Sequence, residues 1–320
     1  MKKHKYILLT ALCVLIIIAI KTMAPSSIRD DTNLKDTFNK EVVIQKMIEA
    51  EKSKDPSFYV FTVLSLSYLL LIIAGIINLF VFFVRSLQKK SLIAAKEKQK
   101  ILPLSYQQIS RIFFDISLLF LVVYTINFAS RTLNWGTYIH NAINFNLAIE
   151  IGIIVIILWA ISPSLRLNLK KPYLLSTLQL YTATLPLIIL TAILLKAIGI
   201  ESQPNPAIKL LFSLENKTII YILLAQITLV GPIAEEIFFR GFIFKLSRKK
   251  YSFLLSAALT SLIFASMHMI TELILPLFII SMAMCYLYEK TQNIVAPIIF
   301  HSIFNSANII LLLSIKNVLG

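Results

Sequence analysis

Charged residues are scarce in this sequence: they make up 15% of its 320 residues, whereas hydrophobic residues make up 58%. Soluble domains carry about 25% charged residues, so this scarcity excludes an ordinary soluble protein. Strand-like alternation of apolar and polar residues is also missing, which excludes a membrane β-barrel. The composition therefore predicts an all-α, polytopic integral membrane helical bundle.

Cysteines and internal repeats are scarce as well. The two cysteines, Cys13 and Cys285, lie within apolar runs, so neither fits an ordinary disulfide or has the surroundings of a nucleophile. The sequence shows no convincing internal repeat, which weakens the alternative of a transporter that uses its polar residues as a proton relay.

Long apolar runs, by contrast, are plentiful and predict eight or nine transmembrane helices. The first run, residues 6–20, follows a basic N-terminus; we interpret it as an uncleaved anchor, with a cleaved signal peptide as the alternative. After it, residues 24–57 are polar and predict a small surface helix, with an added substrate-contacting element as the alternative. The other eight apolar runs cover residues 58–84, 112–129, 145–163, 174–199, 217–244, 252–270, 272–288 and 294–315.

The net charge of +15 is concentrated between the apolar runs. Lys and Arg gather in residues 85–100, 166–171 and 245–250. The positive-inside rule places these loops in the cytoplasm and the C-terminus outside. Their charge predicts contact with anionic membrane lipid, and no nucleic acid is expected as a partner.

A few ionisable residues interrupt this apolar background. Glu235, Glu236 and Arg240 share one membrane segment, and His268 and His301 lie in two later segments. Such side chains cost at least about 2.5 kcal/mol each at the bilayer centre and usually serve a function. Counted from the cytoplasmic turns at about 1.5 Å per residue, Glu235, His268 and His301 lie roughly 21, 29 and 17 Å deep. They can therefore share one layer of the membrane.

Helical spacing separates the two glutamates. Glu236 and Arg240 are four residues apart and can pair on one face of their helix. Glu235 points about 100° away and is left free for proton transfer. His301 and Asn305 also lie four residues apart, and both can donate hydrogen bonds.

Three further features belong to the same segments. Phe264 lies one turn before His268 and is expected to pack against its ring. Gly231 and Pro232 precede the glutamates and are expected to loosen the helix enough to admit water. Glu150 lies near the end of a predicted span, and no special role is assigned to it.

The motifs Glu-Glu-x-x-x-Arg, Phe-x-x-x-His and His-x-x-x-Asn follow one another on late membrane helices. In this order they resemble the CPBP family of intramembrane proteases, which groups CAAX prenyl endopeptidases with bacteriocin-processing and immunity proteins (the Abi family). The resemblance covers about residues 175–315. The chain then divides into residues 1–57, an anchor with a small extracytoplasmic segment; residues 58–172, membrane helices of unassigned role; and residues 173–320, a CPBP-like catalytic membrane domain.

The resemblance implies a role for each motif residue. Glu235 matches the catalytic general base that acts on the attacking water, with His268 assisting it. His301 and Asn305 match the residues that stabilise the developing oxyanion. The supporting positions are matched by Glu236, Arg240 and Phe264.

A metal is the open alternative. Glu235, His268 and His301 are legitimate zinc ligands, and three ligands with one water make a catalytic zinc site. However, the spacing differs from His-Glu-x-x-His, and the family is described both as metalloproteases and as glutamate-dependent enzymes. We prefer metal-free activation of water, with a divalent metal such as zinc as the alternative.

The predicted function is hydrolysis of a peptide bond within or at the membrane, in a CAAX-like, leader-containing or other membrane-associated substrate. The expected location is the cell membrane of a bacterium, because the chain is short and its loops are few. The alternative is a non-catalytic immunity protein that binds a membrane partner, although the intact motif set argues against it.

Overall fold

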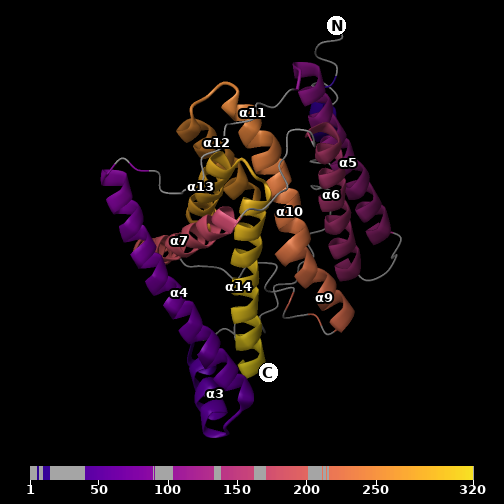
Figure 1. Cartoon of the computed structure of the whole chain (residues 1–320). Coiled ribbons are helices and arrows are strands. Elements are labelled where there is room, and N and C mark those ends of the chain that lie inside the picture. Colours follow the sequence, from indigo (N-terminus) through magenta and orange to yellow (C-terminus); the bar gives the residue numbers. More distant parts are fainter. Residues whose placement is uncertain are drawn as a thin grey trace.

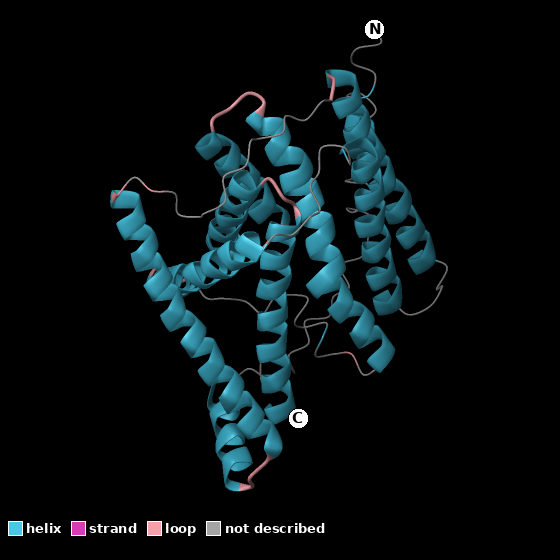
Figure 2. Cartoon of the chain, in the orientation of Figure 1, coloured by secondary structure: helices cyan, strands magenta, loops and turns pink. Residues whose placement is uncertain are grey.

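The computed structural model describes residues 6, 10–14, 40–88, 90, 104–132, 138–161, 171–200, 211, 214 and 216–319. Over this part the chain is helical with short turns, and it contains no strand (Figure 2). The all-α prediction is thus confirmed for the part of the chain that the structure describes. Most of the predicted anchor, and the polar residues 24–39, lie outside the described residues.

Seven helices in the described part are long and apolar enough to cross a membrane. They cover Pro56–Leu87, Tyr106–Ser130, Ile143–Ile161, Tyr173–Ala197, Lys217–Arg248, Thr271–Thr291 and Val295–Val318. An eighth apolar helix, Phe253–Met267, is shorter, because the backbone turns at Met269, which has a φ of 54°. Each apolar run predicted between residues 58 and 315 therefore forms a helix, and the multi-pass membrane architecture is confirmed.

The helices after residue 217 form the centre of the bundle, and earlier helices cover it on both sides (Figure 1). The central helices are α10 (Gly231–Glu236), α12 (Phe253–Met267), α13 (Ile274–Thr291) and α14 (Val295–Leu319). One flank consists of α5 (Tyr106–Thr132) and α6 (Tyr138–Ile161), and the other of α4 (Pro56–Leu87) and α7 (Lys171–Ala197). Two large apolar clusters fill the space between the centre and these flanks.

Helix α4 touches the bundle along a narrow stripe and turns most of its apolar surface outward. At Gly75 a Cβ atom would overlap the carbonyl oxygen of Thr182 on α7, so a residue without a side chain is required there. Close by, the Asn78 amide donates a hydrogen bond of 2.8 Å to the Thr182 hydroxyl. Leu70 and Phe80 are among the exposed side chains, as expected for a surface that faces lipid.

The helix that carries the two glutamates is continuous from Lys217 to Arg248 but changes register twice. It consists of α9 (Lys217–Ala225), the π-helical segment η3 (Gln226–Val230), α10, the π-helical segment η4 (Ile237–Phe244) and α11 (Lys245–Arg248). Single π turns inside α-helices are rare and frequent at functional sites. The loosening predicted for Gly231 and Pro232 thus takes the form of a π-helical turn directly before α10.

Basic residues tie helix ends together at one end of the bundle. The Arg248 guanidinium donates to both carboxylate oxygens of Glu289, at 2.8 and 3.3 Å. Lys249 donates to the Leu104 carbonyl at 2.8 Å. The end of α11, the end of α13 and the start of α5 therefore lie together.

The polar segment before α4 contains the predicted surface helix, α3 (Lys40–Lys52), which packs against α4 and α14. Asp55 then caps α4 by accepting hydrogen bonds of 2.8 Å from the Ser57 amide and hydroxyl groups. These two hydrogen bonds hold the pKa of Asp55 below its ordinary value.

Candidate active site

The two adjacent glutamates occupy different environments. Glu236 is completely buried, whereas the Glu235 side chain is 36% exposed. Neighbouring positions of a helix differ by about 100°, so consecutive side chains point to different surroundings. The divergence predicted from helical spacing is therefore confirmed.

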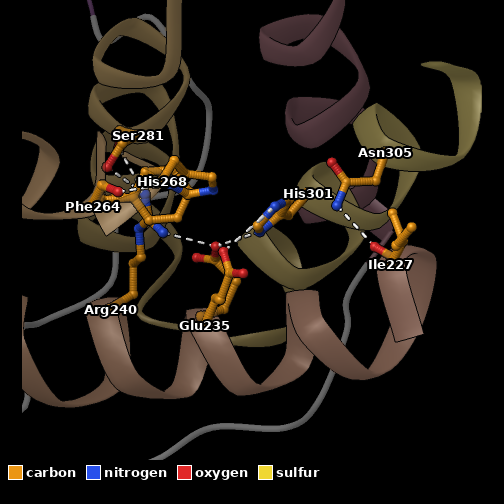
Figure 3. Close-up of polar contacts among 9 residues, drawn as sticks. Ile227, Glu235, Arg240, Phe264, His268, Ser281, His301 and Asn305 are labelled. Carbon is orange, nitrogen blue, oxygen red and sulfur yellow. Dashed lines mark hydrogen bonds and ion pairs between the residues drawn. The ribbon is translucent and has the colours of Figure 1, made fainter. Parts of the chain in front are cut away.

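Glu236 is the centre of a buried polar network. Its Oε1 accepts a hydrogen bond of 2.7 Å from Arg240 Nη1 and another of 2.9 Å from His301 Nδ1 (Figure 3). Arg240 is itself completely buried, and the pair spans one helical turn as predicted. A single carboxylate oxygen thus connects the glutamate helix to α14 and fixes the orientation of the His301 ring.

Two further contacts hold the Arg240 guanidinium. Its Nη2 donates to the Ser281 hydroxyl at 2.6 Å and to the Ser281 carbonyl at 3.2 Å, both on α13. The Phe264 ring from α12 lies 4.9 Å from the guanidinium carbon, within the range of a cation–π interaction. The sequence carries no signal for Ser281, because its hydroxyl is recruited only once α13 packs against η4.

His301 stands between the two glutamates. While its Nδ1 binds Glu236, its Nε2 lies 3.9 Å from Glu235 Oε2. That separation is too long for a hydrogen bond, so a water or a substrate atom would have to connect the two groups. Oε2 of Glu235 is enclosed and accepts no hydrogen bond from any described residue.

His268 ends α12 and is oriented by its own helix. Its Nδ1 lies 2.9 Å from the Phe264 carbonyl oxygen. A carbonyl only accepts, so Nδ1 carries a proton and Nε2 is an acceptor in the neutral ring. The Phe264 ring contacts the rings of both His268 and His301, with centroids 4.9 and 5.9 Å away. The predicted packing of Phe264 on His268 is thus confirmed, and Phe264 lies between the two histidines.

Asn305 is bound to the glutamate helix. Its Nδ2 donates a 2.8 Å hydrogen bond to the Ile227 carbonyl in η3 (Figure 3). In this π register the Gly231 amide donates to the Gln226 carbonyl, and the next amide in the series would donate to Ile227. That next residue is Pro232, which has no N–H group. Asn305 therefore satisfies a carbonyl that the proline leaves without a backbone partner.

A third carboxylate lies near this site, and sequence reasoning missed it. Glu150 on α6 accepts a hydrogen bond of 3.1 Å from the Gln226 amide, and it lies close enough to Glu235 for the two carboxylates to repel one another. The prediction that Glu150 needs no special role relied on an apolar run that begins at residue 145. The helix actually begins at Tyr138, so Glu150 lies in its interior.

The arrangement does not supply a three-ligand metal site. Among the residues that the structure describes, no group of three His, Cys, Asp or Glu side chains is placed to hold a metal ion. The Phe264 carbonyl binds His268 Nδ1 and Glu236 binds His301 Nδ1, which leaves Nε2 of each ring as the nitrogen that could bind a ligand. As placed, Glu235, His268 and His301 are not gathered as a three-ligand site, and the chemistry below is derived from these side chains alone.

Comparisons with known proteins agree with the motifs. Residues 217–307 match the family model described as type II CAAX prenyl endopeptidase Rce1-like, which confirms the resemblance to the CPBP family. The chain is also 30% identical over 114 residues to the "Putative membrane peptidase YdiL" of Bacillus subtilis (strain 168). That match covers 36% of this chain and 45% of the relative, so the aligned segment spans less than half of the relative's length. No solved structure matches the chain significantly.

Proposed function

We propose that this protein is an intramembrane endopeptidase that hydrolyses a peptide bond of a membrane-associated peptide or protein. The observation that carries the proposal is the division between the adjacent glutamates. Glu236 Oε1 accepts hydrogen bonds from both Arg240 and His301, whereas the Glu235 side chain, beside His301, accepts none from any described residue and is 36% exposed. The likeness of residues 217–307 to CAAX prenyl endopeptidases supports a peptide as the substrate.

Glu235 is the proposed general base. Its carboxylate takes a proton from a water molecule, and the water oxygen attacks the carbonyl carbon of the scissile bond. His268 is suited to assist, because its Nε2 accepts a hydrogen bond from the same water while Nδ1 donates to the Phe264 carbonyl. Together the two residues hold the water by both of its hydrogens.

His301 and Asn305 are the proposed donors to the oxyanion. As the water attacks, the carbonyl electron pair moves onto oxygen, and preorganised donors stabilise the resulting charge. His301 donates one proton to Glu236, so its Nε2 donates as well only when the ring carries both protons. That form places a positive ring beside the carboxylates of Glu235 and Glu236. Asn305 offers the second hydrogen of the amide that binds Ile227.

Collapse of the intermediate completes the reaction. The proton held by Glu235 passes to the amide nitrogen, the carbon–nitrogen bond breaks, and the products are a carboxylic acid and an amine. Glu235 returns to its ionised form. Glu236, Arg240 and Ser281 take no part in proton transfer and serve to hold His301 in place.

The substrate class follows from the location of the site. Glu235 and His301 lie on helices long and apolar enough to cross a membrane, so the scissile bond must reach them from within or beside the bilayer. CAAX-like peptides, leader-containing peptides and other membrane-associated peptides fit this requirement. We place the protein in a bacterial plasma membrane, in contact with anionic lipid and without a nucleic-acid partner.

Reconstitution tests the proposal. The wild type and the variants Glu235→Ala and His268→Ala are incorporated into liposomes with a pool of membrane peptides, and new termini are identified by mass spectrometry. The wild type is expected to produce new termini, Glu235→Ala none, and His268→Ala far fewer. Equal cleavage by Glu235→Ala would contradict the proposal. A chelator arm is included, because loss of activity that zinc restores would establish the metal-dependent alternative.

A further inference from the structure

A pair of polar side chains on the α6 side of the glutamate helix is not used by the proposed reaction. Gln226 is 6% exposed, and its amide donates to Glu150 Oε1 at 3.1 Å. The remaining oxygens of the pair, Glu150 Oε2 and Gln226 Oε1, are enclosed and accept no hydrogen bond from any described residue. Glu235 Oε2 is in the same condition.

Helical geometry places these three oxygens along one face. Gly231 and Glu235 are four residues apart and lie above one another on α10. A Cβ atom at Gly231 would meet the Glu150 carboxylate, whose Oε1 would lie 3.6 Å away. Side chains on a helix lean towards its N-terminus, so Glu235 leans towards the turn that holds Glu150 and Gln226.

The chemistry of the three oxygens identifies their partner. A glutamine side-chain oxygen only accepts, and so does an ionised carboxylate, so they cannot satisfy one another. Water supplies two donors and fits a polar site flanked by several acceptors. We propose that Glu150 and Gln226 are positioning residues that bind water molecules leading to Glu235, and that the hydrolytic water is drawn from this store.

The role in catalysis rests on the proposed function, but the presence of water does not, so it is tested separately. Glu150→Cys and Val155→Cys are purified as full-length chains in detergent and treated with a charged, water-soluble thiol reagent. Val155 is the matched control, since it lies on the same helix and is 61% exposed on its apolar outer surface. The wild type serves as the blank, because Cys13 and Cys285 are buried.

Hydration at Glu150 should make its replacement thiol reactive, because thiols react as thiolates and a thiolate requires water. Modification of Glu150→Cys is expected to be at least about tenfold faster than that of Val155→Cys. Rates that are equal, or slower at residue 150, would overturn the proposal. This result stands whether or not the protein cleaves any peptide.

Kinetics then test the link to Glu235. Glu150→Gln still binds water and should keep most of the activity. Glu150→Leu removes the water-binding oxygens and should lower kcat by up to about 100-fold, with KM nearly unchanged. A merely structural tie between α6 and η3 would instead lower the unfolding temperature of Glu150→Leu, which cannot accept from the Gln226 amide, without a selective loss of kcat, and that result would overturn the positioning role. If the wild type cleaves nothing, the proposed function fails, and the labelling rates alone decide whether the site holds water.

Discussion

Glu236 and Glu235 are neighbours in the sequence, but their surroundings differ: Glu236 is completely buried, and the Glu235 side chain is 36% exposed. On the Glu236 side, one carboxylate oxygen binds both Arg240 and His301, and Ser281 binds the other end of the guanidinium. On the Glu235 side, enclosed oxygens have no partner among the described residues. The first region has the character of a support and the second that of a site that awaits water and substrate.

The contrast shows how a membrane helix tolerates the buried charges of Glu236 and Arg240. A buried arginine requires a matching charge, which Glu236 supplies, and hydrogen-bond acceptors, which Glu236 and Ser281 supply to its two terminal nitrogens. Glu236 orients the His301 ring through Nδ1, and Nε2 of that ring faces Glu235.

The largest effect on activity is expected when Glu235 is replaced. Glu235→Gln removes the general base while keeping the size of the side chain, so peptide cleavage should fall by about 10²- to 10⁴-fold. Folding should be unaffected, because Glu235 supports no hydrogen bond among the described residues. Initial cleavage rates in liposomes give the measurement. A variant as active as the wild type would contradict the assignment of Glu235 as the general base.

A large loss of stability is expected when Glu236 is replaced. Glu236→Gln leaves Arg240 buried without its counter-charge, which should reduce the free energy of unfolding by about 3–5 kcal/mol. Glu289→Gln is the matched control, since it breaks a partly exposed pair with Arg248 and should cost about 1 kcal/mol or less. Thermal unfolding in detergent compares the two, and similar losses would show that the Glu236 network is not a special support.

An intermediate effect is expected where Asn305 meets the proline turn. Asn305→Ala leaves the Ile227 carbonyl unpaired and should cost about 1–3 kcal/mol of stability. Pro232→Ala restores an N–H group that can serve this carbonyl, so the cost of Asn305→Ala should shrink in that background. Unfolding of the single and double variants measures this coupling, and additive costs would contradict the assignment.

The smallest effect is expected far from both glutamates and calibrates the others. Asp55→Ala removes the cap of α4 and should lower the unfolding temperature slightly while leaving cleavage unchanged. The pKa of Asp55 is held below its ordinary value of 3.8, so its stabilisation is present above that pH and is lost as the pH falls through the lower folded value. A wild-type advantage that persists well below that pH would contradict the cap.

Much of this fold could be predicted from sequence. A helix that crosses a bilayer must be apolar over the thickness of the hydrocarbon core, and hydropathy marks the runs that meet this condition. The apolar runs between residues 58 and 315 became helices, and counting residues from the basic turns placed Glu235 and His301 in one layer. The pairing of Glu236 with Arg240 followed from helical spacing alone. These features depend on local geometry, which a sequence specifies directly.

Other features depended on how helices rotate against one another. The bond between His301 and Glu236 requires a particular rotation of α14, which helical periodicity does not give. Likewise, Asn305 was expected to face the substrate, but its amide first serves a carbonyl exposed by a π turn that spacing rules for α-helices do not predict. Glu150 was overlooked because hydropathy marks where an apolar run begins, and its helix begins earlier.

The central claim is that the two adjacent carboxylates have different roles: Glu235 is the general base, and Glu236 supports the structure of the site. Its most direct test is the unfolding temperature and the cleavage rate of Glu235→Gln and Glu236→Gln, measured side by side on the same preparations. The account predicts a Glu235→Gln protein as stable as the wild type but inactive, and a Glu236→Gln protein that unfolds at a clearly lower temperature. Equal destabilisation by the two substitutions, or wild-type cleavage by Glu235→Gln, would contradict it.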